Sequence, residues 1–169
     1  HLDLGENQIT QINVAPLVNL VELSVDNNQL GAIDLSTNTK LKVLDLEDNK
    51  LQSLQISHLD QLTQLDVSRN QLTNLDLSQN INLRVVDVSN NLLTSIDLNN
   101  KKIEGLNLSG NVHLTLLFLK VLKGSLVGPN CEQWGVCMSL TNLPNLKYVC
   151  VNEGYEDQMK NILNDYGYN

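Results

Sequence analysis

The stretch Leu41-Lys42-Val43-Leu44-Asp45-Leu46-Glu47-Asp48-Asn49-Lys50-Leu51 holds the pattern that decides the fold of this chain. Leucines stand at its first, fourth, sixth and eleventh places, and an asparagine stands between the last two of them. The same frame returns every 20 or 21 residues, and its asparagines are Asn7, Asn28, Asn49, Asn70, Asn91 and Asn111. A fixed short period predicts a solenoid, in which each turn of the chain packs only on its neighbours.

Each turn contains two segments in which apolar and polar residues alternate, as in Leu44-x-Leu46 and then Leu54-x-Ile56. Such alternation indicates a strand, because successive side chains of a strand point to opposite faces. We therefore expect stacked 21-residue turns with two short parallel strands each. A turn of this length is too short for a good helix between the strands, so the corners are expected to be tight.

The repeated asparagines are interpreted as a structural ladder rather than as a binding site. Each is expected to point inward at a corner, where its amide can bond to backbone N–H and C=O groups that the bend leaves unpaired. The corner of the second half-turn is mixed in composition. Asn38 and Asn80 alternate there with Leu17, Leu59 and Lys101.

This pattern resembles the leucine-rich repeat family, and more narrowly its bacterial subclass of nested 20–21-residue repeats, the IRREKO type. The resemblance covers residues 2 to about 118. The segment Val149-Cys150-Val151 and the residues after it resemble the C-terminal cap of secreted bacterial leucine-rich repeat proteins, in which a strand of this kind precedes a helix. The resemblance implies a secreted or surface-type bacterial protein.

The repeat frame weakens toward the C-terminus. We expect one structural domain that consists of leucine-rich repeats over 1–118, a degenerate repeat or loop over 119–145, and a last strand with a helical cap over 146–169. The frame returns at Leu146-x-x-Val149-x-Val151, and the apolar residues after Tyr155 have the spacing of an amphipathic helix that ends at Gly167. This helix should cover the last turn, which would otherwise expose its apolar interior and a free strand edge.

The overall charge argues against one class of partner. With 11 basic and 19 acidic residues, the net charge is −8, which disfavours nucleic acid and favours a basic partner.

No apolar run approaches the ~18 residues of a membrane span. The chain starts at His1 without a signal peptide, and Leu2 and Leu4 already belong to a repeat, so the natural protein is expected to extend further or to have been trimmed.

A column of polar residues occupies the outward position between the strand leucines. Its members are Asp3, Ser24, Asp45, Asp66, Asp87 and Asn107. Three interpretations are open: a solvated face, a surface for a basic protein, or a calcium site, for which a flat ladder offers few of the six to eight oxygens that are needed. A similar column at Asp34, Gln55, Asp76 and Asp97 argues against a ladder shaped for one ligand. Exposed carboxylates are expected to keep ordinary pKa values, which disfavours acid catalysis.

The cysteines are Cys131, Cys137 and Cys150, all near the C-terminus. In a secreted chain Cys131 and Cys137 could close a small loop, and the alternative is three reduced thiols. A zinc site with His113 lacks the usual paired Cys-x-x-Cys spacing. No spacing suggests a nucleophile with its base, and glycine-rich phosphate loops are absent from the sequence.

These observations predict a protein-binding module without enzymatic activity, cofactor or metal, from a secreted or cell-surface bacterial protein. The partner is expected to be a protein or peptide, with a basic one favoured. The predicted binding face consists of Glu22, Ser24, Asp26, Asp45, Glu47, Asp66, Asp87, Asn107 and Tyr148. The alternative is a structural spacer or a self-associating repeat segment of a larger surface protein.

Overall fold

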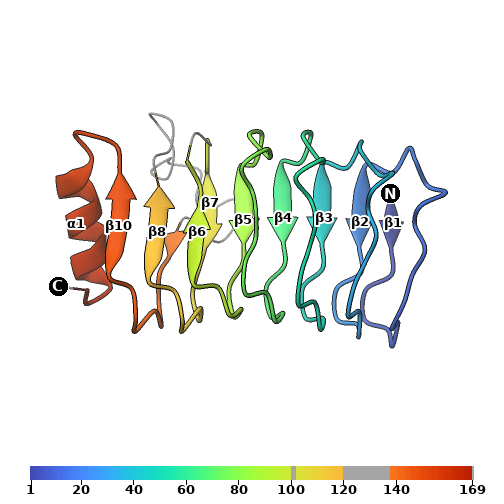
Figure 1. Cartoon of the computed structure of the whole chain (residues 1–169), viewed down its shortest axis with the longest axis horizontal. Helices are drawn as coiled ribbons and strands as arrows, with labels where there is room; N and C mark the ends of the chain where they lie inside the picture. The colour runs from blue at the N-terminus through green and yellow to red at the C-terminus, as the bar shows by residue number, and fades with distance from the viewer. Residues whose placement is uncertain (100–101, 120–137, 169) are drawn as a thin grey trace.

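The computed structural model describes residues 1–99, 102–119 and 138–168. The chain forms an elongated coil of stacked turns, with the N-terminus near one end and a single helix at the other (Figure 1). Two parallel sheets run along the coil. The long sheet has the strand order β1 (Leu2–Asp3), β2 (Glu22–Ser24), β3 (Val43–Asp45), β4 (Gln64–Asp66), β5 (Val85–Asp87), β7 (Gly105–Asn107) and β9 (Met138–Ser139).

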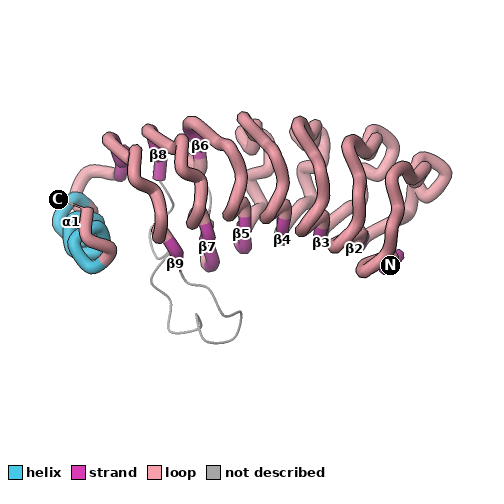
Figure 2. The backbone as a smooth tube through the Cα atoms, turned by 90° about the horizontal axis from the view of Figure 1, so that it is seen from below, coloured by secondary structure: helices cyan, strands magenta, loops and turns pink. Residues whose placement is uncertain are grey.

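The short sheet lies on the other side of the coil near the C-terminal end (Figure 2). Its order is β10 (Tyr148–Val151), β8 (Leu116–Leu119) and β6 (Ser95–Asp97). The helix α1 (Glu156–Asp165) follows β10 and closes this end. The predicted solenoid with a C-terminal helix is therefore confirmed.

Aliphatic side chains fill the interior because the strands stack in register. Leu23 pairs with Leu44, Leu44 with Leu65, and Leu65 with Val86, and all four side chains are buried. The inward residues that follow β2 to β5 are buried in the same way, namely Val25, Leu46, Val67 and Val88. Each turn therefore adds a layer of similar shape, and burial of these layers supplies most of the free energy of folding.

The frame asparagines tie neighbouring turns together at the corners. Asn49 Oδ1 accepts a hydrogen bond of 2.9 Å from Leu30 N, and Asn49 Nδ2 donates to Val25 O at 2.8 Å. The same amide donates to Leu46 O within its own turn. Asn28, Asn70 and Asn91 repeat this pattern, and these three side chains are 2% to 8% exposed.

The two end members of this ladder differ slightly from the others. Asn111 is fully buried and bonds to Leu93 N and Val88 O. Asn7 is exposed, and its amide donates to Leu4 O and Gly5 O in its own turn. Asn7 therefore makes these hydrogen bonds only within its own bend, whereas each later asparagine also bonds to the turn before it.

At the corner of the second half-turn, the buried backbone carbonyls are bonded by asparagine in some turns and by another side chain in others. Asn80 Nδ2 donates to Ile56 O and Leu59 O of the preceding turn, at 2.8 and 2.9 Å. Where Leu59 takes the asparagine position, Nε2 of the adjacent His58 lies 3.0 Å from Leu35 O, the carbonyl equivalent to Ile56 O. His58 therefore has a structural role in the corner.

One residue per turn adopts a left-handed conformation directly before the frame asparagine. These residues are Glu6, Asn27, Asp48, Arg69, Asn90 and Gly110, with φ between 49° and 73°. Gly110 has an additional constraint, because a Cβ atom at this position would meet the side chain of Asn90. Glycine adopts this conformation without the cost that a Cβ atom adds.

The structure differs from the sequence-based expectation in the number of strands per turn. The second half-turns around Leu35, Ile56 and Leu77 are not strands, although their inward residues are buried. Their chain bends at once into the corner, as the hydrogen bond from Asn80 N to Leu77 O shows. A second strand forms only from β6 onward.

The position of β10 is the main correction. The sequence frame places Leu146 to Val151 in the first half-turn, but β10 pairs with β8 in the short sheet. The long sheet continues instead through β9, which pairs with β7. Both half-turns use the same leucine rhythm, so the pattern does not distinguish one side of the coil from the other.

The helix covers the end of the coil with its apolar side. Met159 is buried, and Ile162 and Leu163 pack against the core. Gly167, with φ 78°, follows the helix and donates from its N–H to Asn164 O, as expected for a glycine that ends a helix. Among the described residues, no helix has both the length and the apolar character needed to cross a membrane.

Replacement of Asn70 by alanine is expected to destabilise the coil strongly. The substitution leaves the buried Leu51 N without its partner, at a cost of ~1–3 kcal/mol. It also removes the shorter of the two hydrogen bonds that Leu46 O accepts, the other being from Asn49 Nδ2. We expect a loss of about 3 kcal/mol in the free energy of unfolding, measured by urea denaturation. Asn74→Ala, at an exposed position of the same turn, is the control and should change stability by less than about 0.5 kcal/mol.

Gly110→Ala and Gly31→Ala form a second matched pair. The alanine at 110 must adopt a left-handed conformation next to Asn90, so we expect a loss of ~1–2 kcal/mol. No atom lies within 4 Å of a Cβ added to Gly31, and alanine there should be neutral or stabilising by up to ~1 kcal/mol. Equal melting temperatures for the two variants would contradict the role assigned to Gly110.

Candidate recognition face on the long sheet

The outward column predicted from the sequence lies on the long sheet. Asp3 pairs with Ser24, Ser24 with Asp45, and Asp45 with Asp66. The register continues through Asp87, Asn107 and Ser139. Strands in a sheet lie ~4.8 Å apart, so the long sheet presents a straight row of short polar side chains.

The column has a local structural role that the sequence did not reveal. Oδ1 of Asp45, Asp66 and Asp87 accepts a hydrogen bond from the backbone N–H two residues later, at 2.9 to 3.0 Å. Asp3 and Asn107 make the same bond to Gly5 N and Ser109 N. An aspartate side chain that binds its own backbone in this way favours a turn, and here it directs the chain out of each strand.

The same device explains the second aspartate column. Asp34, Asp76 and Asp97 accept from Ser36 N, Ser78 N and Asn99 N at 2.8 to 2.9 Å. The two columns differ in their surroundings, because the side chains of this second set are exposed and those of Asp45, Asp66 and Asp87 are half-buried. Burial therefore distinguishes the long-sheet column from a solvated face of the same composition.

Asp45 and Asp66 have raised pKa values, which corrects the expectation of ordinary ones. Burial raises the pKa of Asp66 to about 6, and the charges of Asp87 and Asp45 act in the same direction. Burial also raises the pKa of Asp45, with contributions from Asp26, Glu47 and Asp3. The hydrogen bonds from Ser68 and Glu47 oppose these shifts but do not cancel them.

Three acidic side chains converge at the centre of the face. Asp45, Glu47 and Asp66 each place a carboxylate oxygen within 4.8 Å of the others. Burial raises the pKa of Glu47, followed by the charge of Asp66, while Arg69 lowers it. Three carboxylates fall short of the six to eight oxygens that calcium takes, so this cluster alone does not define a metal site.

Arg69 is a member of this face that the sequence analysis did not include. Its guanidinium lies 3.5 Å from Glu47 Oε1 and 3.9 Å from Asp48 Oδ2, on the exposed side of the cluster. The left-handed position of Arg69 before the corner asparagine brings it there. A basic residue at the repeat position that holds Glu6 and Asp48 in other turns is the signal that could have identified it.

The ends of the face are held by side-chain contacts. Glu22 Oε2 lies 2.9 Å from His1 Nδ1. Ser24 Oγ donates to Asp26 Oδ1 at 2.5 Å, and this bond and the one from Asn27 lower the pKa of Asp26. Asn107 Nδ2 donates to Asp87 Oδ2 at 2.8 Å. The structure therefore brings together all the predicted face residues from Glu22 to Asn107.

Tyr148 lies apart from this face. It belongs to β10 in the short sheet, where it pairs with Leu116 and is 65% exposed. The predicted extension of the face toward Tyr148 is wrong, because Ser139 of β9 follows Asn107 in the long sheet. The proposed Cys131–Cys137 disulfide lies outside the described residues, and Cys150 is a half-buried free thiol of β10.

Comparison with known proteins supports the leucine-rich repeat assignment. Residues 18–72 match the family model described as leucine rich repeat. The functional domain of InlJ from Listeria monocytogenes, which includes a cysteine ladder, is 26% identical with a TM-score of 0.57. The match covers 89% of this chain and 34% of that domain. A search of curated proteins finds no match.

A second solved structure has the same fold. A leucine-rich repeat protein from Leptospira interrogans is 24% identical with a TM-score of 0.53, and the match covers 96% of this chain and 41% of that one. This chain therefore spans less than half of the length of both proteins. The fold is that of a leucine-rich repeat solenoid.

Asp66→Asn is expected to stabilise the protein near neutral pH. The pKa of Asp66 is raised from 3.8 to about 6, so folding favours its protonated form. Its ionisation costs stability as pH rises from about 4 to about 6, with an upper limit of about 3 kcal/mol. Asparagine keeps the acceptor for Ser68 N without the charge, as Asn107 does for Ser109 N.

The measurement is the melting temperature of wild type and Asp66→Asn between pH 4.5 and 7.5. Wild type should lose stability as pH rises to about 6 and then level off, while the variant should show a smaller change and melt higher at pH 7. Asp34→Asn is the control, because its hydrogen bond from Ser36 lowers the pKa of that exposed carboxyl. A variant less stable than wild type at pH 7 would contradict the assignment.

Proposed function

We propose that this chain is a protein-recognition module without enzymatic activity and that the outward face of the long sheet binds its partner. The recognition face comprises Glu22, Ser24, Asp26, Asp45, Glu47, Asp66, Asp87 and Asn107, together with Arg69. The observation that carries the proposal is the fixed register of half-buried carboxylates along this face.

Rigidity favours binding by such a surface. The aspartates are held by backbone N–H groups, and the strands beneath them are fixed by buried leucines and corner asparagines. Side chains that are already ordered lose little conformational entropy when a partner binds. The raised pKa of Asp66 reflects a carboxylate that is poorly solvated in the free protein, and a partner that brings a cation would relieve that cost.

The chemistry of the face favours a basic protein or peptide. A row of acidic side chains attracts lysine and arginine and speeds the encounter of the two molecules. Arg69 already demonstrates the geometry, since its guanidinium lies beside Glu47 and Asp48. A partner arginine that approaches Asp45 and Asp66 would meet oxygens from two neighbouring strands.

A bacterial secreted or cell-surface context is part of the proposal. It is supported by the resemblance of the C-terminal strand and helix to the cap of secreted bacterial leucine-rich repeat proteins and by the similarity to a Listeria monocytogenes domain. The nested 20–21-residue frame supports assignment to the IRREKO subclass. The chain would then act as one binding segment within a larger surface protein.

The test compares two triple variants that change the net charge equally. Asp45→Asn, Asp66→Asn and Asp87→Asn together neutralise the recognition face, and Asp34→Asn, Asp76→Asn and Asp97→Asn neutralise the other column. A partner captured by crosslinking to the wild-type chain is purified and titrated against all three proteins by calorimetry. The first variant should bind on the order of 10-fold more weakly or worse, since each lost charge contact contributes ~0.2–1 kcal/mol.

The control variant should bind within about threefold of wild type, and its salt dependence should be unchanged. Equal loss in the two variants would indicate only long-range attraction to net charge. Full binding by the first variant would exclude this face and favour the alternative of a spacer or a self-associating segment. Asparagine is used in place of alanine because it retains the backbone hydrogen bonds of the aspartates.

A further inference from the structure

At the C-terminal end of the coil, the backbone hydrogen bonds of the last strand differ between the two sheets. At the long sheet, Tyr166 Oη donates to Met138 O at 2.5 Å and Tyr168 Oη donates to Leu140 O at 2.6 Å. Leu143 N donates to Tyr168 Oη at 3.0 Å, whereas Asn28 N at the equivalent place donates to Asp48 O of the next turn. The two tyrosines therefore replace the hydrogen bonds that a following turn would make.

The short sheet ends at β10 without such a replacement in the described part of the chain. β10 is the edge of this sheet and pairs with β8 on one side. Tyr148 N donates toward β8, to Thr115 O. Because alternate residues of a strand direct their N–H and C=O groups to opposite sides, the backbone groups of Val149 and Val151 point toward the open edge.

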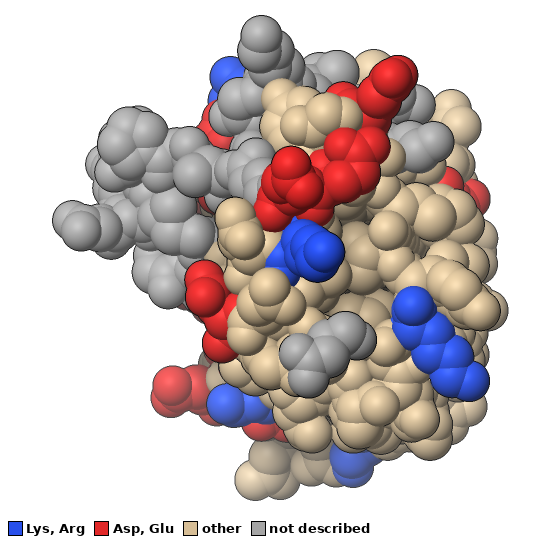
Figure 3. Space-filling view, turned by 90° about the vertical axis from the view of Figure 1, so that its left-hand side faces the viewer, with Lys and Arg blue, Asp and Glu red and all other residues tan. Residues whose placement is uncertain are grey.

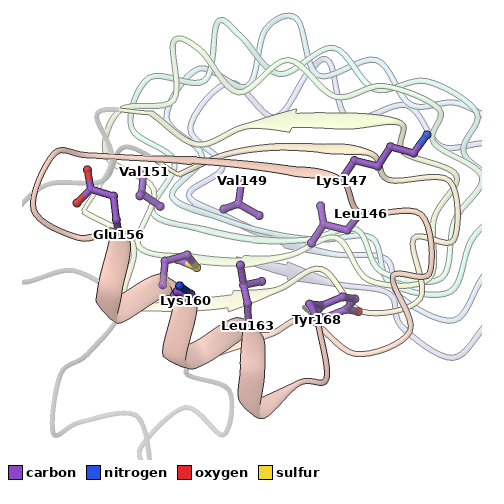
Figure 4. A pocket seen from close by; sticks show the side chains of 9 residues that line it. Leu146, Lys147, Val149, Val151, Glu156, Lys160, Leu163 and Tyr168 are labelled. Atoms are coloured by element: carbon purple, nitrogen blue, oxygen red, sulfur yellow. The ribbon is translucent and has the colours of Figure 1, made fainter.

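An apolar groove runs along this edge, between β10 and α1 (Figure 4). Its volume is about 250 Å³. Val149 and Val151 line one wall, and Met159 and Leu163 line the other. An apolar cavity of ~150 Å³ holds a benzene molecule, so this groove has room for two aliphatic side chains.

The two valines would normally be covered. They pair in register with Leu117 and Leu119 of β8, which are 0% and 2% exposed, yet Val149 and Val151 are only half-buried. The next strand of the short sheet would bury them, as β10 buries its neighbour. A strand placed there would both pair with the free edge and fill the groove with its inward side chains.

Two lysines and one glutamate line the margins of the groove. The exposed Lys147 and Lys160 lie at its margins with Glu156, and the Glu156 carboxylate is already engaged by Gly154 N at 2.7 Å. Figure 3 looks onto this end and shows separate blue basic side chains, with red acidic side chains beside the central one, along the top and at the left. Glu153, Asp157 and Asp165 lie elsewhere on this end, so a carboxylate of a bound segment is favoured only next to Lys147 or Lys160 at the groove itself.

We propose that the groove between β10 and α1 binds an extended peptide segment of a partner protein, which adds as a strand beside β10. Two apolar side chains at alternate positions enter the groove, and a flanking carboxylate lies next to Lys160. Main-chain hydrogen bonds supply affinity in this mode of binding, and the alternate side chains supply specificity. This site lies on the short sheet and is independent of the recognition face on the long sheet.

The probe is a synthetic peptide, acetyl-Thr-Val-Thr-Val-Thr-Glu-amide, titrated into isotope-labelled protein and followed by NMR. The control peptide, acetyl-Thr-Thr-Val-Val-Thr-Glu-amide, has the same composition, but its adjacent valines point to opposite faces. We expect saturable binding of the first peptide with a Kd of about 1 mM or tighter, and at least a 10-fold weaker effect for the second. The amides of Val149 and Val151 should shift and gain protection from hydrogen exchange.

Two protein variants test the walls of the groove. Lys160→Glu should weaken binding by about threefold or more through like-charge repulsion, while Lys50→Glu, on a distant turn, should have no effect. Leu163→Ala keeps the surface charge and removes one apolar wall, and its fold is checked by the spectrum of β2 to β5. It should also weaken binding, because the peptide loses apolar contact.

Several results would overturn the proposal. These are no saturable binding of the alternating peptide, equal binding of the two peptides, or shifts that avoid Val149 and Val151. Concentration-dependent dimerisation through β10, detected by light scattering without peptide, would show that the occupant is a second copy of this chain. Unchanged peptide affinity in the long-sheet triple variant is expected, so failure of one proposal does not decide the other.

Discussion

The whole coil depends on the satisfaction of backbone groups at its corners. A tight bend turns N–H and C=O groups inward, where water cannot reach them, and an unpaired buried group costs ~1–3 kcal/mol. One asparagine per turn resolves this cost by accepting from the previous turn and donating to both turns. Because the bonds join neighbouring turns, each corner sets the position of the next layer, and the leucine rows remain aligned over the length of the coil.

The surface chemistry is a consequence of that regular backbone. An aspartate at the end of a strand binds the N–H two residues later, so the same residue that shapes the turn also presents a carboxylate outward. In the long sheet the strands bring these carboxylates together and partly bury them, and burial raises the pKa values of Asp45 and Asp66. On the opposite column the same sequence motif remains exposed, and the pKa of Asp34 is lowered instead. One motif thus gives two electrostatic environments.

At the C-terminal end the repeats stop, and other residues make the hydrogen bonds that a following repeat would supply to the long sheet. Leu143 occupies the place of a corner asparagine, and the hydroxyl of Tyr168 contributes the hydrogen bonds that the next turn would have made. The cap therefore supplies hydrogen bonds as well as apolar cover. These hydrogen bonds go to the long sheet, whereas β10 of the short sheet keeps one free edge and two half-buried valines in the described part of the chain. The two sheets therefore differ in that the hydroxyls of Tyr166 and Tyr168 bond to Met138 O and Leu140 O at the end of the long sheet.

Local patterns were enough to predict the period, the inward leucines, the corner asparagines and the capping helix, because each is a short motif that repeats or ends at a glycine. They also identified the residues from Glu22 to Asn107 that share one face. The placement of Tyr148 on the other sheet and the half-burial of Asp66 emerged only from the folded coil. Both half-turns have the same leucine rhythm, so the side of the coil depends on how many residues intervene. Burial of a carboxylate depends on neighbours 21 residues away, which no local pattern specifies.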